Sequence, residues 1–227
     1  MPKYILVRHG ESVWNSERRI QGNRDPGLSA RGRRQTELLV AHLKTHVTPA
    51  VAAIYTSPLR RAAETADQIA GAYGLPVVSD SGLREMSLGR WEGKTVTEIQ
   101  DAFPGRYEKW LEDPLAFPAP DGEDLGSFER RVLGTLERMQ RAHPGADLIL
   151  VSHGGVIKAL LCFVLGLDVR HLFRLKQDNT AVSQIELDGR VRRVLLLNDT
   201  CHLAGGGGGV AAQDVLTDAA EIADPAF

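Results

Sequence analysis

Basic side chains follow three apolar segments of the sequence. YILV runs directly into Arg8 and His9, DLILVS runs into His153, and VAAIYT ends shortly before Arg61. Arginine offers planar, bidentate hydrogen bonds that match phosphate oxygens, and the neutral form of histidine is available as a nucleophile near pH 7. Two arginines and two histidines brought together would suit a dianionic phosphate, so the chemistry that these residue types indicate is phosphoryl transfer.

Two glycines add backbone donors to this set. Gly154 and Gly155 follow His153 and open a predicted helix, whose first N–H groups and positive dipole end favour an anion. We therefore expect the N-terminus of this helix to contribute to the same phosphate site.

Alternating strands and helices must position these residues. Short continuous apolar runs indicate strands that are buried on both faces, and apolar residues at helical spacing indicate the helices between them. A helix is expected to begin at Ser29 as its N-cap, another at Ser57 with Pro58 in its first turn, and the second of these to stop at Gly74. The predicted strands are residues 3–8, 51–56, 76–79 and 147–152, with a hairpin over 181–198 that turns at Asp188-Gly189; the predicted helices are residues 29–46, 58–73, 124–142 and 154–165.

This order of elements predicts an α/β protein. We expect a three-layer α/β/α sandwich with a mainly parallel central sheet, one antiparallel edge hairpin and a small helical cap insertion. Sites in such sheets lie beyond the carboxyl ends of the strands, where the three sets of basic residues would converge.

The expected domain organisation is one domain and a tail. Residues 1–203 form the domain, with the cap at about 86–123, and residues 204–227 form a Gly-rich linker and tail. Aromatic residues in and beside the cap have two interpretations, a small hydrophobic core of the cap or a wall that faces the substrate; they are Phe103, Tyr107, Trp110, Phe117 and Phe128.

Composition excludes several classes of function. The 227 residues carry a formal net charge of −2, without the basic excess of a nucleic-acid or anionic-membrane binder. The chain shows no secretory leader and no apolar run of the roughly 20 residues that span a bilayer, so a cytoplasmic location is expected. Cys162 and Cys201 are expected to be reduced.

One histidine pair raises the question of a metal. His42 and His46 lie one helical turn apart, but the stretch reads HLKTH rather than HExxH, and no third ligand is near in the sequence. No metal and no cofactor are therefore expected.

At its basic residues the chain resembles the histidine phosphatase superfamily, also called phosphoglycerate mutase-like. The resemblance rests on an ordered set of motifs over residues 1 to about 200, of which the RHG motif alone would be weak evidence; they are LVRHGESVWN, QG at 21–22, LS at 28–29, SPLRRAAETA, LREMSLGRWEG and VSHGG.

The resemblance implies a role for each matching residue. His9 would be the nucleophile that carries a phosphoryl group, and Glu85 the general acid, which must be protonated to donate to the leaving oxygen. Arg8, Arg61 and His153 would grip the phosphoryl oxygens, with Arg60 left at the surface. The resemblance also implies phosphate contacts from four further residues: Asn15, Gln21, Gly22 and Gly154.

Three functions remain open at this point. The first is a metal-independent phosphatase that acts on a small-molecule phosphate ester, which the WEG form after Glu85 favours within the family resemblance. The second is a cofactor-dependent phosphoglycerate mutase, and the third is a non-catalytic binding relative. No nucleic-acid or membrane partner is expected, and a homodimer is a family-level expectation.

Overall fold

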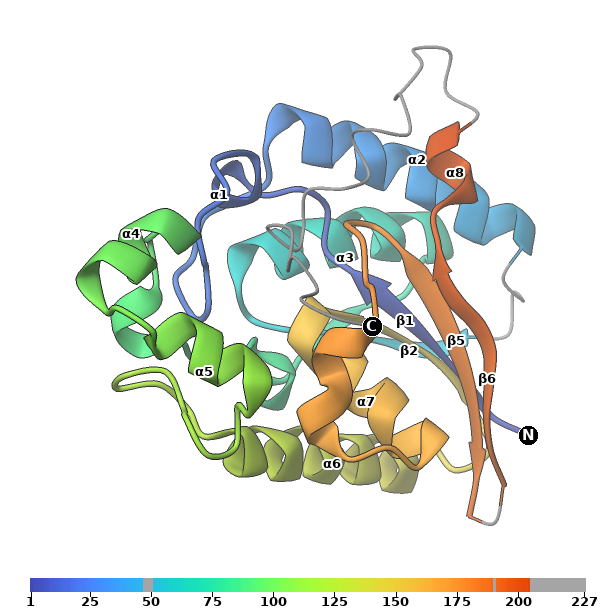
Figure 1. Ribbon diagram of the computed structural model, residues 1–227. Helices are drawn as coiled ribbons and strands as arrows, with labels where there is room; N and C mark the ends of the chain where they lie inside the picture. The colour runs from blue at the N-terminus through green and yellow to red at the C-terminus, as the bar shows by residue number, and fades with distance from the viewer. Residues whose placement is uncertain (47–50, 190, 205–227) are drawn as a thin grey trace.

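A computed structural model describes residues 1–46, 51–189 and 191–204 of the chain. Its single six-stranded sheet has the order β3-β2-β4-β1-β5-β6, and helices cover both faces (Figure 1). The strands are β1 (Lys3–Arg8), β2 (Val51–Thr56), β3 (Val77–Ser79), β4 (Asp147–Ser152), β5 (Val182–Asp188) and β6 (Val191–Asp199); the α-helices are α1 (Val13–Ser16), α2 (Ala30–His46), α3 (Arg60–Tyr73), α4 (Val96–Ala102), α5 (Arg106–Glu112), α6 (Leu125–Ala142), α7 (Gly154–Leu165) and α8 (Cys201–Ala204), with 3-10 turns η1 (Ser81–Leu83), η2 (Gly89–Trp91) and η3 (Val169–Arg174).

The sheet is parallel through four strands and antiparallel at one edge. β3, β2, β4 and β1 run parallel, whereas β5 pairs antiparallel with β1 and forms a hairpin with β6. The predicted sandwich with an antiparallel edge hairpin is therefore confirmed, and the carboxyl ends of β1, β2 and β4 lie at one edge of the sheet.

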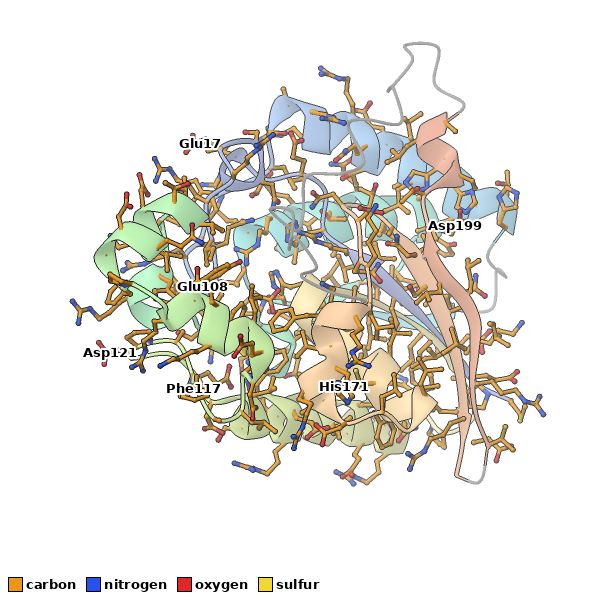
Figure 2. All side chains as sticks on the ribbon, viewed as in Figure 1. Glu17, Glu108, Phe117, Asp121, His171 and Asp199 are labelled. Carbon is orange, nitrogen blue, oxygen red and sulfur yellow. The ribbon has the colours of Figure 1, made fainter. Side chains whose placement is uncertain are left out.

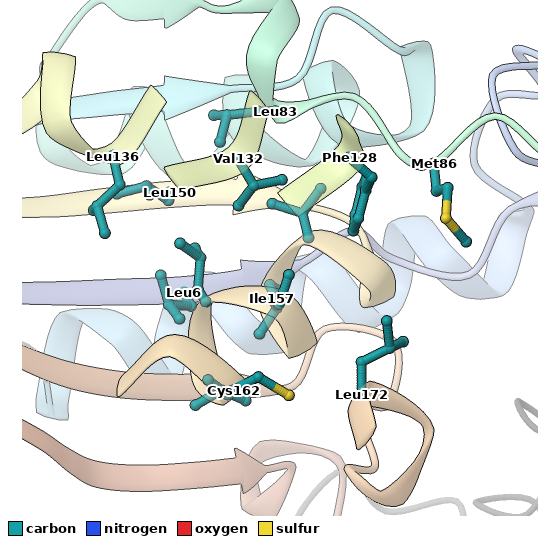
Figure 3. Packing of buried hydrophobic residues seen from close by; sticks show 14 of the residues in the cluster. Leu6, Leu83, Met86, Phe128, Val132, Leu136, Leu150, Ile157, Cys162 and Leu172 are labelled. Carbon is teal, nitrogen blue, oxygen red and sulfur yellow. The ribbon is translucent and has the colours of Figure 1, made fainter. Parts of the chain in front are cut away.

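Alternating residues of the strands fill two hydrophobic cores. In β1, Ile5 and Val7 pack on the side of α2 and α3, whereas Tyr4 and Leu6 pack on the side of α6 and α7. Figure 3 shows Leu6 of β1 in this second core, between Leu150 of β4 and Ile157 of α7. Burial on both faces explains why these strands read as continuous apolar runs rather than as alternating ones.

One predicted helix boundary is wrong. Helix α3 begins at Arg60 with Leu59 as its N-cap, not at Pro58 with Ser57 as the cap. The hydroxyl of Ser57 lies 2.8 Å from His153 Nε2 and also accepts the N–H of Leu59 at 3.3 Å, so it serves a tertiary contact and a local turn rather than the cap of a helix that begins at Pro58. The two other predicted cap positions agree with the structure, because Ser29 Oγ accepts the N–H of Gly32 and Gly74 adopts the left-handed conformation after α3.

The segment between Met86 and Glu123 carries η2, α4 and α5 beside one end of the sheet (Figure 1). Trp110 is buried and packs edge-on against Trp91, with ring centroids 5.5 Å apart, and Phe103 and Tyr107 pack on the same core. These contacts favour the core interpretation of the aromatic residues. Phe117, labelled in Figure 2, is the exception, because it is 41% exposed.

Both cysteines are free thiols, Cys162 in the core and Cys201 at the surface. Within the described ranges, no helix is both long enough and apolar enough to cross a bilayer. The predicted tail after residue 204 lies outside the described residues.

Candidate active site

His9 follows directly after the central strand β1 and is 2% exposed. Its Nδ1 lies 2.7 Å from the carbonyl oxygen of Gly10, which can only accept a hydrogen bond, so Nδ1 carries the proton. The other ring nitrogen, Nε2, then holds the lone pair, and the Nε of Arg61 donates to it over 3.3 Å. The backbone thus selects the tautomer in which Nε2 carries the lone pair.

Arg61 is held beside His9 by the loop that follows α1. The side chain is 1% exposed, and its terminal nitrogens donate to the carbonyl oxygens of Arg24 at 2.8 Å and Gly22 at 2.9 Å. Burial lowers the pKa of Arg61 to about 10, while the charge of Glu85 opposes this shift. Arg61 therefore remains a cation at pH 7 and lies close enough to Glu85 to interact with it electrostatically.

Arg8 and His153 complete the group that the strands bring together. Arg8 ends β1 and donates to the carbonyl oxygen of Gln177. His153 follows β4, and its ring centroid lies 5.2 Å from that of His9 in an edge-on arrangement. The three sets of basic residues therefore converge at the carboxyl edge of the sheet, as the sequence predicts.

The two histidines, His9 and His153, are neutral. Burial is the largest cause that holds the pKa of His9 well below its usual value, and the charges of Arg61 and Arg8 lower it further. The pKa of His153 is also held well below its usual value, again mainly by burial. Desolvation by burial therefore lowers the pKa of His9 more than the neighbouring charges do. Two permanent cations, Arg8 and Arg61, remain.

His153 has one ring nitrogen engaged and one without a protein partner. Its Nε2 is 2.8 Å from Ser57 Oγ, whereas its Nδ1 is buried and has no hydrogen-bond partner among the described residues. A buried polar atom of this kind costs free energy unless something binds to it. His153 Nδ1 is therefore the ring nitrogen that could form a hydrogen bond with a bound group.

Glu85 is fixed by backbone donors. Its Oε1 accepts the N–H of Met86 at 2.9 Å, and its Oε2 accepts the N–H of Gly155 at 3.0 Å, in the first turn of α7. One of the donors expected for phosphate at this helix N-terminus is therefore occupied by the predicted acid. A Cβ added at Gly154, which precedes Gly155, would meet the side chain of Arg8 at 3.7 Å.

The loop that carries Glu85 is held by Arg131 of α6. The guanidinium donates to the carbonyl oxygens of Gly82 and Arg84 at 2.8 and 2.9 Å, and it pairs with Glu123 at 2.6 Å. It also lies 3.4 Å from the carbonyl oxygen of Glu85. Sequence analysis missed Arg131, because a lone arginine on a helix carries no signal of the loop to which it binds.

Three predicted phosphate contacts lie on the segment after β1. Asn15 caps α1, where its Oδ1 accepts the N–H of Ser12, and Gln21 Oε1 accepts the hydroxyl of Ser12 at 2.7 Å. Only the amide nitrogens of these two side chains could therefore donate to an anion. Gly22 contributes its carbonyl oxygen to Arg61, and its φ of +50° places it in the left-handed region that favours glycine.

Arg60 lies outside this group. Its side chain is 66% exposed and pairs with Glu64 one helical turn away. This position agrees with the expectation that Arg61, not Arg60, belongs to the site.

Two residues of the segment before β5 hold the backbone of His9 and were also missed. Asn179 Nδ2 donates to the carbonyl oxygen of His9 at 3.0 Å, and the N–H of Thr180 lies 3.3 Å from the same oxygen. Thr180 adopts a φ of +57°, which is rare for a β-branched residue and is typical of strain kept near a functional site. The polar run QDNT could have drawn attention to this segment, but nothing in it indicates contact with His9.

Comparison with known proteins gives consistent matches over the described fold. Residues 4–200 match the sequence profile of the histidine phosphatase superfamily (branch 1). The chain is 38% identical over 204 residues to phosphoserine phosphatase 1 of Hydrogenobacter thermophilus, covering 89% of this chain and 95% of the relative.

Solved structures agree. YhfR of Bacillus stearothermophilus superimposes with a TM-score of 0.83 at 34% identity, covering 89% of this chain and all of that one. A phosphoserine phosphatase variant from Entamoeba histolytica, in complex with phosphoserine, superimposes with a TM-score of 0.79 at 28% identity, with coverage of 89% and 100%.

Proposed function

The chain belongs to the histidine phosphatase superfamily (branch 1) and is a phosphoric monoester hydrolase, and we propose that it hydrolyses small phosphomonoesters through a phosphohistidine on His9. The observation that carries this proposal is the state of His9. Its Nδ1 proton is held by Gly10, its Nε2 carries the lone pair that accepts the Nε–H of Arg61, and two arginine cations act on it. A neutral, oriented imidazole beside fixed cations is the arrangement that in-line attack on a phosphate requires.

In the first proposed step, His9 Nε2 attacks phosphorus as the bond from phosphorus to the ester oxygen breaks. Glu85, in its protonated form, gives its proton to the departing alkoxide, so an alcohol leaves and a phosphohistidine remains. Arg8 and Arg61 stabilise the charge on the phosphoryl oxygens without a metal ion.

In the second proposed step, water attacks the phosphohistidine. The Glu85 carboxylate accepts a proton from this water as the P–N bond breaks, which restores neutral His9 and releases inorganic phosphate. His153 assists both steps in the proposal, because its buried Nδ1 supplies an N–H to a phosphoryl oxygen while Ser57 donates to its Nε2.

O-phosphoserine is the first substrate that we propose to test. The support for this choice comes from the relative in Hydrogenobacter thermophilus and from the phosphoserine-bound structure from Entamoeba histolytica. The loop and helices between Met86 and Glu123 lie beside the end of the sheet, where differences among relatives would select the leaving group.

The test is phosphate release from O-phosphoserine, 3-phosphoglycerate, glucose 6-phosphate and p-nitrophenyl phosphate, with EDTA present. His9→Ala should abolish release, and His171→Ala, a half-buried histidine of η3, serves as the matched control. The protein should then be labelled with a ³²P substrate, and the stability of the label should be measured in acid and in base. A phosphohistidine survives base and is lost in acid.

Other outcomes would reassign the protein. Interconversion of 2- and 3-phosphoglycerate in the presence of 2,3-bisphosphoglycerate, without net phosphate release, would make it a mutase. Neither activity in a folded sample would leave a binding role.

A further inference from the structure

A second cluster of chemically reactive side chains lies where the end of β6 and α8 meet helix α2, the region in which Figure 2 labels Asp199. It consists of His42, Asp199 and Cys201, and His202 lies beside His42. We propose that these four residues form a structural zinc site that fastens the segment after β6 to α2.

Three of the four proposed ligands, His42, Asp199 and Cys201, each place one ligand atom within 4.8 Å of the others. Asp199 Oδ2 is 3.4 Å from Cys201 Sγ and 3.4 Å from His42 Nε2, and Cys201 Sγ is 3.7 Å from His42 Nδ1. Zinc–sulfur bonds of about 2.3 Å and zinc–nitrogen or zinc–oxygen bonds of about 2.0 Å in a tetrahedron place ligand atoms about 3.3–3.6 Å apart. The two His42 distances use different ring nitrogens, and one ligand atom from each of the three residues lies within 4.8 Å of the others, so the His42 ring must shift to complete this triangle through one nitrogen.

His202 is the fourth proposed ligand, and a separate observation supports it. The side chain is 9% exposed, and its Nδ1 is buried without a hydrogen-bond partner in the described part of the chain. Its ring centroid lies 5.4 Å from that of His42, and its Nε2 is held 3.0 Å from Thr180 Oγ1. A hydrogen bond on one ring nitrogen that leaves the other free is the usual arrangement of a metal-binding histidine.

The ligand set selects the metal. A thiolate with two imidazoles and a carboxylate matches zinc rather than the oxygen-binding ions magnesium and calcium. Zinc binding would form the Zn–S bond and release to solvent the thiol proton that Cys201 now donates to Asp199. The thiolate and the Asp199 carboxylate then balance the two charges of the ion.

Sequence analysis saw only His42 and His46, because the other ligands come more than 150 residues later. His46 stacks on His42, with ring centroids 4.3 Å apart, and its Nδ1 is already engaged by Thr45. The HLKTH pair is therefore not itself the site. The fold instead brings the sequence DTCH at 199–202 against one face of α2.

The site would also support the catalytic segment from a distance. His202 contacts Thr180, and Thr180 in turn contacts the carbonyl oxygen of His9 through its N–H. A metal at this place would hold α8 and, through it, the strained Thr180, without touching the substrate.

The test uses the tag-free full chain, stripped with EDTA and kept reduced with a phosphine. Titration with Co²⁺ should produce a thiolate-to-cobalt charge-transfer band at one equivalent, and Zn²⁺ should displace it. Zinc at about 100 times its dissociation constant should raise Tm by about 5–10 °C. Cys201→Ser should remove the band and Asp199→Asn should weaken binding at least tenfold, whereas Cys162→Ala and His171→Ala should retain both the band and the Tm shift.

Absence of the band and of the Tm shift in the wild-type chain would overturn the proposal, as would binding that survives unchanged in Cys201→Ser. The outcome is separable from that of the phosphatase proposal. His9→Ala should still bind Co²⁺, and the stripped wild-type chain should still release phosphate at 25 °C.

Discussion

Glu85 and Gly155 are in direct contact because Gly155 has no side chain. The N–H of Gly155 donates to Glu85 Oε2 at 3.0 Å, and a Cβ at position 155 would overlap Oε1 of the same carboxylate. The first turn of α7 thus holds the proposed acid in place of a solvent molecule or an anion. The sequence predicts that the N-terminus of α7 binds phosphate. At Gly155, its N–H group instead orients the carboxylate of Glu85.

Gly155→Ala should therefore impair acid catalysis more than folding. The added methyl group pushes Glu85 off its backbone donors, so we expect kcat for O-phosphoserine to fall about 10²-fold, within the range of one general acid. With p-nitrophenyl phosphate, whose leaving group needs no proton, the loss should be under about fivefold. Gly71→Ala, at an exposed site of α3 where a Cβ meets nothing within 4 Å, is the control. Equal losses on both substrates would contradict the assignment of Glu85.

Arg131→Lys should loosen the loop that carries Glu85. Lysine keeps the charge next to Glu123 but cannot reach the carbonyl oxygens of Gly82 and Arg84 with a planar fork. We expect kcat for O-phosphoserine to fall about tenfold with KM nearly unchanged, and Tm to fall by a few degrees. Arg130→Lys, on the exposed neighbouring position, should change neither quantity, and an unaltered kcat in Arg131→Lys would show that the loop is held by other contacts.

Ser57→Ala should disturb His153. The substitution removes the hydroxyl from His153 Nε2 inside the protein, where an unpaired polar atom costs about 1–3 kcal/mol. The histidine is then free to take the wrong tautomer, and kcat/KM should fall by about 10- to 100-fold. Ser79→Ala, at the exposed end of β3, provides the comparison. Full activity in Ser57→Ala would remove His153 Nδ1 from the proposed phosphate contacts.

The free energy of unfolding should fall as the pH is lowered from 7 to 5 in phosphate-free buffer. The pKa values of His9 and His153 are well below 6.5 in the folded protein, whereas the unfolded chain protonates both near pH 6.5. The unfolded state thus binds more protons below this pH, and each histidine costs up to about 1.4 kcal/mol per pH unit until its folded pKa is reached.

His9→Asn isolates this effect, since the amide of asparagine preserves a donor toward Gly10. The dependence of the urea midpoint on pH should become shallower in His9→Asn and should not change in His171→Asn. A wild-type midpoint that is constant from pH 7 to pH 5 would show that the buried imidazoles do take up protons.

Much of the fold could be predicted from the periodicity of apolar residues and from the residues that begin and end helices. The runs YILV and DLILVS are buried on both faces, and such runs have few alternatives to central strands. The start of α3 could not be predicted in this way, because Ser57-Pro58 is a good local signal for a helix start. A tertiary contact, from Ser57 to His153, uses the same hydroxyl.

The residues of the candidate site also fall into those that the order of strands and helices predicts and those that only tertiary contacts reveal. His9, Arg61 and His153 were predictable because each stands directly after a strand or in the first turn of the next helix, so that topology alone brings them together. Arg131 and Asn179 act on backbone carbonyl groups, which have no sequence signature. The neutral state of His153 could not be predicted from the sequence, because it depends on complete burial rather than on residue type.

The position of β1 in the sheet sets when the enzyme can first work. β1 is the first strand of the chain, yet its two neighbours are β4 and β5, formed by residues 147–188. On the ribosome, the segment that bears Arg8 and His9 must wait unpaired until most of the protein has emerged. Assembly of the candidate site is consequently a late event of synthesis, and an N-terminal fragment that ends before β4 would carry His9 without His153 beside it.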